Sequence, residues 1–280
     1  MLINATTVIE KARAQTVVLS MMTKYERMFY KTVYAAIKSQ YYEAARLVAM
    51  GSDDIDQAIY NKSLLFRKSF EVNYKRIILQ FGKLLLDEIE DIGKSVGGYE
   101  TKSFFAEYIS HMFNWMRFQM GNKIKGINRT TVKAIRRIIT VGRMDGKSSV
   151  EIARDIRKKS LIVNIARSLN IARTETHTVA MKSLNKAMDA SRLKYEKEWM
   201  TAGDERVRGG SKGFNHRAAD GERVGQEEYF VNTGESLEYP GDPAGSAGNI
   251  CRCRCSQLFH TVAVAIWRSA RKYIPAKAVA

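Results

Sequence analysis

The cysteines of this chain lie close together, and a histidine precedes them. Cys251, Cys253 and Cys255 form the run CRCRC and are the 3 cysteines of the sequence, with His216 upstream. Cysteine thiolates and histidine imidazole are ligands that Zn²⁺ binds tetrahedrally. Zinc is therefore the cofactor that these residues could hold, and the alternative is a set of thiols with His216 in a hydrogen-bond network. An odd count without a distant partner excludes a disulfide framework.

Charged residues around the histidine suggest a second kind of chemistry. Asp204, Arg206, Arg208 and Asp220 could pair with one another or with backbone carbonyls, because an arginine fork binds carboxylates and carbonyls. Alternatively, His216 could act as a general base that Asp220 orients, which would be hydrolytic chemistry. No nucleophile or phosphate-binding loop accompanies them. The sequence therefore predicts that these charges hold loops together, with no catalytic residues and no enzyme activity.

Positive charge is concentrated in residues 123–173. This stretch holds 14 basic and 3 acidic residues, whereas the whole chain has a net charge of +17. Such a surface attracts polyanions, nucleic acid first. No aromatic or Asn/Gln cluster accompanies the charge, so non-specific phosphate contact is favoured over base reading; a solvated basic face is the alternative. The candidate contact residues are Lys123, Lys125, Arg129, Lys133, Arg136, Arg137 and Arg143.

The elements that must position these residues are mostly helices. No proline occurs between residues 5 and 200, and apolar residues recur there every three to four positions, as on one face of a helix. Glycine clusters and prolines follow after residue 203. The expected fold is mainly α, an extended helical bundle region followed by a small loop-rich α+β C-terminal domain. The expected helices end near residue 51 and restart after the capping residues 52–54. Further helices are expected over 102–120, as two short helices around a turn within 126–160, and from 162 to 199. Ser148 or Ser149 is the expected cap of the second short helix.

These patterns, together with the ordered motifs of residues 125–258, divide the chain into three expected parts. Residues 1–122 form an N-terminal helical region, and residues 123–258 form a second domain with a helical part (123–200) and a small loop and strand part (201–258). Residues 259–280 form a basic-amphipathic tail, which could pack as a helix, dock on a partner or lie on a membrane surface. No window is long and apolar enough for a membrane span, and the N-terminus lacks a signal peptide, so the protein is expected in a cytoplasm.

Several ordered motifs within residues 125–258 resemble one known family. The segments GINRTT and DGKSSVEIA come first, and a helix that contains ARTE follows them. The later motifs, in order, are a tryptophan, spaced Asp and Arg residues, a histidine, an Asp-Gly pair, a PGDP turn and a final Cys-Arg-Cys. Together they are similar to the phage Mu F-like family of minor head, or head morphogenesis, proteins. The residues that carry the family motif are Arg173, Thr174, Glu175, Trp199, Asp204, Arg206, Arg208, Asp220, Gly221, Pro240 and Asp242.

The chain departs from the family pattern in two places. The segment GGSKGFN widens the gap between Arg208 and His216, which the family usually keeps to a few residues. The usual Asn-Cys-Arg-Cys is represented by NICRCRC, so either overlapping Cys-x-Cys pair could be the equivalent one. Cys253 and Cys255 are favoured, because the SQL that follows them resembles the family's ending.

The resemblance implies a structural function in a phage particle. It implies a minor head protein that is assembled in the host cytoplasm, resides in the virion near the portal or the head interior, and has the portal protein and capsid proteins as partners. The basic segment adds non-specific contact with packaged DNA as an expectation. Two alternatives remain: a virion-associated effector enzyme, such as a nuclease or transferase, and a transient DNA-binding assembly factor.

Overall fold

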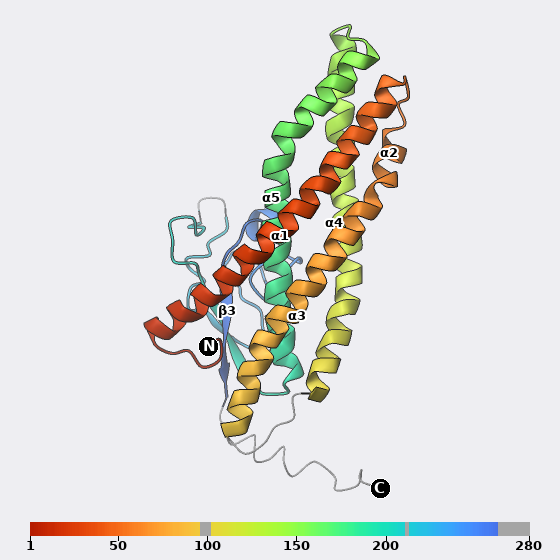
Figure 1. The fold of residues 1–280 in the computed structure, drawn as a ribbon. Helices are drawn as coiled ribbons and strands as arrows, with labels where there is room; N and C mark the ends of the chain where they lie inside the picture. The colour runs from red at the N-terminus through yellow and green to blue at the C-terminus, as the bar shows by residue number, and fades with distance from the viewer. Residues whose placement is uncertain (96–101, 211–212, 263–280) are drawn as a thin grey trace, which may run out of the picture. The chain divides into compact units, whose positions relative to one another are not determined.

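The computed structural model describes residues 1–95, 102–210 and 213–262, which form two compact units. Unit 1 comprises Met1–Met21, Ile78–Met112 and His177–Ala280, and unit 2 comprises Met22–Ile77 and Phe113–Thr176. The predicted mainly helical fold with a small α+β part is confirmed. The helices are α1 (Val8–Ala49), α2 (Ile55–Asn61), α3 (Ser63–Ser95), α4 (Lys102–Met144), α5 (Ser149–Ala190) and α6 (Ala247–Ile250) (Figure 1). Among the described helices, none is long and apolar enough to cross a membrane.

Unit 2 is a helical bundle with an aromatic core. Its segments of α1, α3, α4 and α5 run side by side (Figure 1). Phe29 of α1 meets Phe70 and Tyr74 of α3 edge-on, with ring centroids 4.9 and 6.0 Å apart. All three side chains are fully buried. Large aromatic side chains with a helical repeat therefore bring the helices together, as their spacing predicts.

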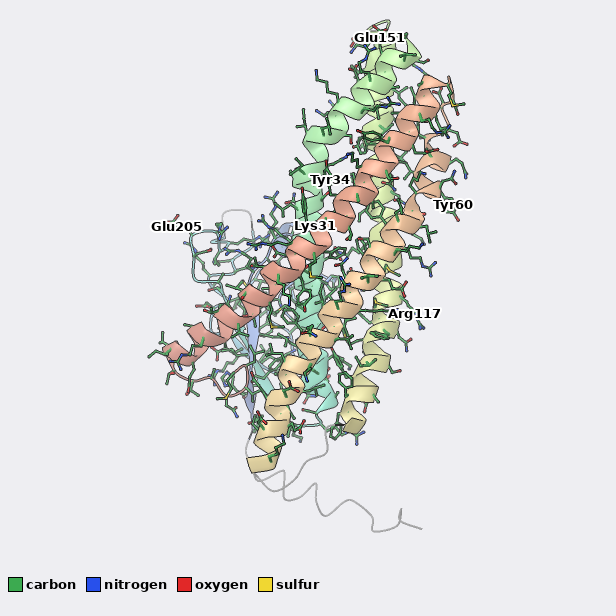
Figure 2. All side chains as sticks on the ribbon, in the orientation of Figure 1. Lys31, Tyr34, Tyr60, Arg117, Glu151 and Glu205 are labelled. Carbon is green, nitrogen blue, oxygen red and sulfur yellow. The ribbon has the colours of Figure 1, made fainter. Side chains whose placement is uncertain are left out.

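Local capping determines where the helices of unit 2 begin. The Asp54 carboxylate accepts a hydrogen bond from the Gln57 amide at 3.0 Å and caps α2. At the start of α5, Ser148 and Glu151 form a reciprocal capping box: the Ser148 amide donates to the Glu151 carboxylate at 2.8 Å, and the Glu151 amide donates to the Ser148 hydroxyl at 3.3 Å (Figure 2). Both caps agree with the predicted helix starts.

Helix α4 corrects the prediction of a helix over 102–120 followed by short helices. It is one helix of 43 residues that passes through Gly121 and Gly126 without a break. A mid-helix glycine costs only about 1 kcal/mol relative to alanine. The buried stripe that includes Met120, Ile135 and Ile139 continues beyond both glycines, and its packing outweighs that cost. Only the turn before α5 separates two helices here, and both are long.

Unit 1 contains a three-stranded antiparallel sheet. Its strands are β1 (Tyr195–Met200), β2 (Arg223–Gly225) and β3 (Ser256–Thr261), in the order β2-β1-β3. Tyr195 pairs with Thr261 and Met200 with Ser256, so β1 and β3 match along their length. The N-terminal residue Ile3 bridges to Phe259 in parallel and extends the sheet beyond β3. The two ends of the described chain thus meet in one sheet.

The strand β1 corrects a second prediction. The helical part was expected to span residues 123–200 with a helix to Trp199, but α5 ends at Ala190 and β1 follows it. Arg192 adopts a positive φ of 58° at the turn between them. The sequence YEKEWM can form a central strand because β2 and β3 satisfy its backbone groups on both sides. Those partners are distant in sequence, so local periodicity missed them.

The predicted tail, residues 259–280, coincides only in part with described structure. Residues 259–261 belong to β3. Residues 263–280 lie outside the described residues, and the predictions for an amphipathic tail fall on them.

A close contact in unit 1 gives a stability prediction. An added Cβ at Gly82 of α3 would lie 2.3 Å from the ring of Tyr108, whose hydroxyl donates to the Ile78 carbonyl at 2.6 Å. We expect Gly82→Ala to lower the free energy of unfolding by about 1–3 kcal/mol, measured by urea denaturation, because the buried ring must shift.

The matched control is Gly121→Ala in α4, where an added Cβ would meet nothing within 4 Å. It should raise the free energy of unfolding by up to about 1 kcal/mol through helix propensity. Equal effects at the two glycines would contradict the contact.

Candidate functional site

Three of the predicted metal ligands converge in unit 1. One ligand atom each from His216, Cys253 and Cys255 lies within 4.8 Å of the others, and all three residues are buried. The His216 Nδ1 is 3.4 Å from the Cys255 Sγ and 3.5 Å from the Cys253 Sγ. His216 lies in a loop after β1, whereas the two cysteines lie in the segment just before β3. The fold thus assembles these side chains from segments that are separated in sequence.

The fourth predicted ligand, Cys251, lies apart from this cluster. Its side chain is exposed. Its backbone carbonyl instead accepts a hydrogen bond from the guanidinium of Arg208. The histidine therefore lies beside Cys253 and Cys255. Of the two overlapping Cys-x-Cys pairs, this is the one that the resemblance of the following SQL segment favours.

A series of hydrogen bonds fixes the other side of the His216 ring. Its Nε2 lies 2.5 Å from the Oδ1 of Asn249, and the Nδ2 of Asn249 donates to the Glu235 carboxylate at 3.0 Å. The carboxylate of Glu235 also accepts from the Ser246 amide at 2.9 Å. Buried polar side chains that orient an imidazole in this way are typical of the surroundings of a metal ligand.

A second histidine reaches the cluster from α5. The Nε2 of His177 lies 2.7 Å from the carbonyl oxygen of Cys255, and its imidazole interacts with the thiol of Cys253. Gly241, with a φ of +79°, packs against this ring so closely that an added Cβ would lie 2.3 Å from the His177 Nδ1. The adjacent Thr178 hydroxyl donates to the Gly241 carbonyl at 2.8 Å. The PGDP turn is thus docked on α5 beside the cysteines.

The two buried thiols differ in acidity. Burial is the main reason that the pKa of Cys255 rises well above its usual value, and the neighbouring Cys253 raises it further. Burial also opposes ionisation of Cys253, but its interactions with Cys255, His177 and His216 lower its pKa well below the usual value. Cys253 is therefore the thiol that ionises first.

The cluster sits in a small apolar core. Trp199, Ala219, Phe230 and Leu237 surround the two cysteines. The Trp199 ring meets the His216 ring at 5.4 Å between centroids and the Phe230 ring at 5.3 Å, both edge-on. So small a core provides little hydrophobic stabilisation by itself.

The predicted charged residues form contacts within the loops. Arg254 binds the Asp204 carboxylate through one nitrogen at 2.5 and 2.6 Å, and the Arg206 guanidinium approaches the same carboxylate at 3.1 Å. The hydrogen bond from Arg254 is the main cause that lowers the pKa of Asp204 to about 2. Asp220 accepts from the Thr201 amide at 2.7 Å. Arg254 was not predicted as the partner of Asp204.

The Asp242 carboxylate completes the PGDP turn. Its oxygens accept from the amides of Glu238 and Ala244 at 2.9 and 3.0 Å. Pro240 and Asp242 are both buried. These contacts explain an aspartate at this position by local turn geometry.

The ARTE motif lies in unit 2. Glu175 is buried, accepts from the Tyr74 hydroxyl at 2.6 Å and pairs with Lys123 at 3.2 Å. Arg173 approaches Glu26 of α1 at 3.5 Å, and Thr174 is buried. The motif therefore connects α1, α3, α4 and α5 within the bundle.

The predicted phosphate contacts divide into paired and unpaired cations. Lys123, Arg136 and Arg143 form ion pairs with Glu175, Asp56 and Asp53. Lys125 and Arg129 are exposed. Lys133 and Arg137 line a groove of about 820 Å³ in unit 2, and α5 contributes two further exposed lysines to it, Lys158 and Lys159. Within the part of the chain that the structure describes, these last four cations form no ion pair.

Sequence reasoning missed two residues of the cysteine cluster. His177 was noticed only as part of the helix that carries ARTE, and Asn249 only as part of NICRCRC. Their positions beside known motifs were the available indication: His177 follows ARTE on the same helix, and Asn249 precedes the first cysteine. Their roles depend on the PGDP turn packing against α5 and on Asn249 reaching His216, and no local pattern specifies these contacts.

The contact between Gly241 and His177 generates a prediction. Alanine at Gly241 would carry the strain of a positive φ and also overlap the imidazole, so we expect Gly241→Ala to destabilise unit 1 more than strain alone does. The control is Gly221→Ala, which has the same φ of +79° with nothing within 4 Å and should cost only about 1–2 kcal/mol. Urea denaturation of both variants measures the difference. Equal losses would contradict a close contact with His177.

Comparison with known proteins identifies the segment that contains these motifs. Residues 133–258 match the family model described as Phage Mu protein F like protein. The match covers the end of α4, α5, the strands β1 and β2, and the cysteine cluster. No curated protein and no solved structure matches the chain.

Proposed function

We propose that this chain, which belongs to the phage Mu F-like family through residues 133–258, is a minor structural protein of a phage head and acts during head assembly. The family match is the single observation that carries the proposal. The proposed location is the virion head, in the interior or near the portal. The portal protein and capsid proteins are the proposed partners.

The use of the motif residues supports a structural role rather than catalysis. The Asp204 carboxylate accepts a hydrogen bond from Arg254, and the Asp220 carboxylate accepts one from the Thr201 amide. The buried Glu175 carboxylate contacts Tyr74 and Lys123. Each of these carboxylates stabilises a loop or a helix contact. His216, the only candidate general base of the sequence analysis, is buried against Asn249 and the two thiols.

The groove in unit 2 is the proposed contact with packaged DNA. Lys133 and Arg137 of α4 and Lys158 and Lys159 of α5 line it together. Asp155 also lines the groove, but Lys147 pairs with it at 2.8 Å. Four cations without acidic partners on two adjacent helices fit a phosphate backbone and give no base selection.

Copy number tests the proposed function. Quantitative mass spectrometry of purified mature virions and of empty precursor heads should detect a few to a few tens of copies in both, relative to the major capsid protein. Presence in precursors alone would indicate the transient assembly factor instead. Absence from both particles would refute the virion role and favour the effector enzyme.

The DNA contact is tested by charge reversal. We expect Lys158→Glu with Lys159→Glu to weaken binding of duplex DNA at about 50 mM salt and to reduce the slope of log K against log salt by about 2, because each phosphate contact contributes about 0.9. Fluorescence anisotropy at several salt concentrations measures both quantities.

Lys31→Glu with Lys68→Glu is the matched control. Both lysines are exposed in unit 2 and neither lines the groove, and Figure 2 shows Lys31 on α1. The control changes the net charge by the same amount, so equal weakening would assign binding to overall charge and contradict the groove.

A further inference from the structure

We propose that His177, His216, Cys253 and Cys255 bind one Zn²⁺ ion as a closed structural site in unit 1. The site is independent of the proposed role in the phage head. It replaces the exposed Cys251 of the sequence-based ligand set with His177 of α5. Three of the donor atoms lie close together, His177 binds the backbone of the same cysteine segment, and all four side chains are buried.

The donor atoms of His216, Cys253 and Cys255 are spaced as zinc requires. In a tetrahedral site with Zn–S of about 2.3 Å and Zn–N of about 2.0–2.1 Å, the sulfur and nitrogen ligands are about 3.6 Å apart. The His216 Nδ1 lies 3.4 Å from one sulfur and 3.5 Å from the other. The three ligand atoms therefore already occupy one face of such a tetrahedron.

The hydrogen bonds around His216 determine which of its nitrogens can bind a metal. The Glu235 carboxylate only accepts hydrogen bonds, so the Asn249 Nδ2 faces it at 3.0 Å and the Asn249 Oδ1 faces the ring at 2.5 Å. The His216 Nε2 must then carry the proton. In the neutral ring the Nδ1 lone pair consequently points at the two sulfurs, which is the form that a metal ligand needs.

The same argument applies to His177. Its Nε2 lies 2.7 Å from the Cys255 carbonyl, which only accepts, so this nitrogen carries the proton and the Nδ1 keeps its lone pair in the neutral ring. This hydrogen bond places the ring of His177, a residue of α5, beside the backbone of the second cysteine of the cluster. A glycine at 241 keeps any side chain away from the space beside the Nδ1.

Burial of the ligands indicates a structural zinc site and not a catalytic one. All four ligands are buried, so no open coordination position remains for a substrate, as it would in a catalytic zinc site. The ligands come from α5, the loop after β1 and the segment before β3. One ion would therefore link three segments around a core of few apolar residues, which is where a small domain needs such a link.

Metal analysis and spectroscopy of the full chain test the proposal. Protein purified under reducing conditions with zinc, and then dialysed against metal-free buffer, should retain about one zinc per chain by elemental analysis. X-ray absorption at the zinc edge should show two sulfurs at about 2.3 Å and two nitrogens at about 2.0–2.1 Å. This measurement uses the natural sequence, so it does not depend on the folding of any variant.

Matched variants identify the ligands. Cys253→Ser and Cys255→Ser should each lose most of the zinc, whereas Cys251→Ser should retain it, because only the first two side chains are in the cluster. His177→Gln should weaken zinc retention against a competing chelator and leave two sulfurs with fewer nitrogens. Circular dichroism of each variant verifies that the helices persist.

Three results would overturn the proposal. Natural-sequence protein with no zinc after reduction and zinc loading would leave hydrogen-bonded thiols as the explanation of the cluster. A Cys253–Cys255 disulfide that persists under reduction, seen as two fewer titratable thiols, would exclude both ligands. Three sulfurs at the zinc edge, lost in Cys251→Ser, would show that Cys251 rather than His177 completes the site.

Discussion

The pairing of polar groups inside a small core is the constraint on which unit 1 depends. A buried polar group without a partner costs about 1–3 kcal/mol, and the apolar core around Trp199 is too small to absorb many such costs. Glu198 of β1 accordingly contacts Lys11, Arg223 and His260 at once. Lys197 on the same strand donates to the carbonyls of Glu228 and Glu238 at 2.8 and 3.1 Å. The cluster of His216 with two cysteines is the third case of this kind.

Unit 2 follows a different physical rule. Aromatic packing such as that of Phe29, Phe70 and Tyr74 contributes to its stability, and the buried carboxylate of Glu175 is paired between the helices. Its helices can therefore carry many exposed cations without loss of the core. This division is compatible with the DNA contact that we propose for unit 2.

Several residues that carry the resemblance to the family form contacts within unit 1. Gly241 is required because His177 lies against its backbone, and Asp242 caps the turn that brings it there. Asp204 is required because Arg254 lies beside the cysteines and binds its carboxylate. These residues are widely separated in sequence but each acts on the same small region of unit 1. Constraints of packing and hydrogen bonding thus account for residue types that resemble a catalytic set.

The sequence by itself determined the helical class and the concentration of positive charge, because helical periodicity and charge are local properties. It proposed His216 with Cys251, Cys253 and Cys255 as ligands from their side-chain chemistry, and only the family resemblance favoured the last two cysteines. It also located the starts of α2 and α5 through their capping residues. Only the tertiary structure decided that α4 continues through Gly126, that YEKEWM is a central strand, and that His177 rather than Cys251 lies at the cysteine cluster. Each of these depends on a partner far along the chain, such as β3 for β1 or Gly241 for His177, and no local pattern specifies such a contact.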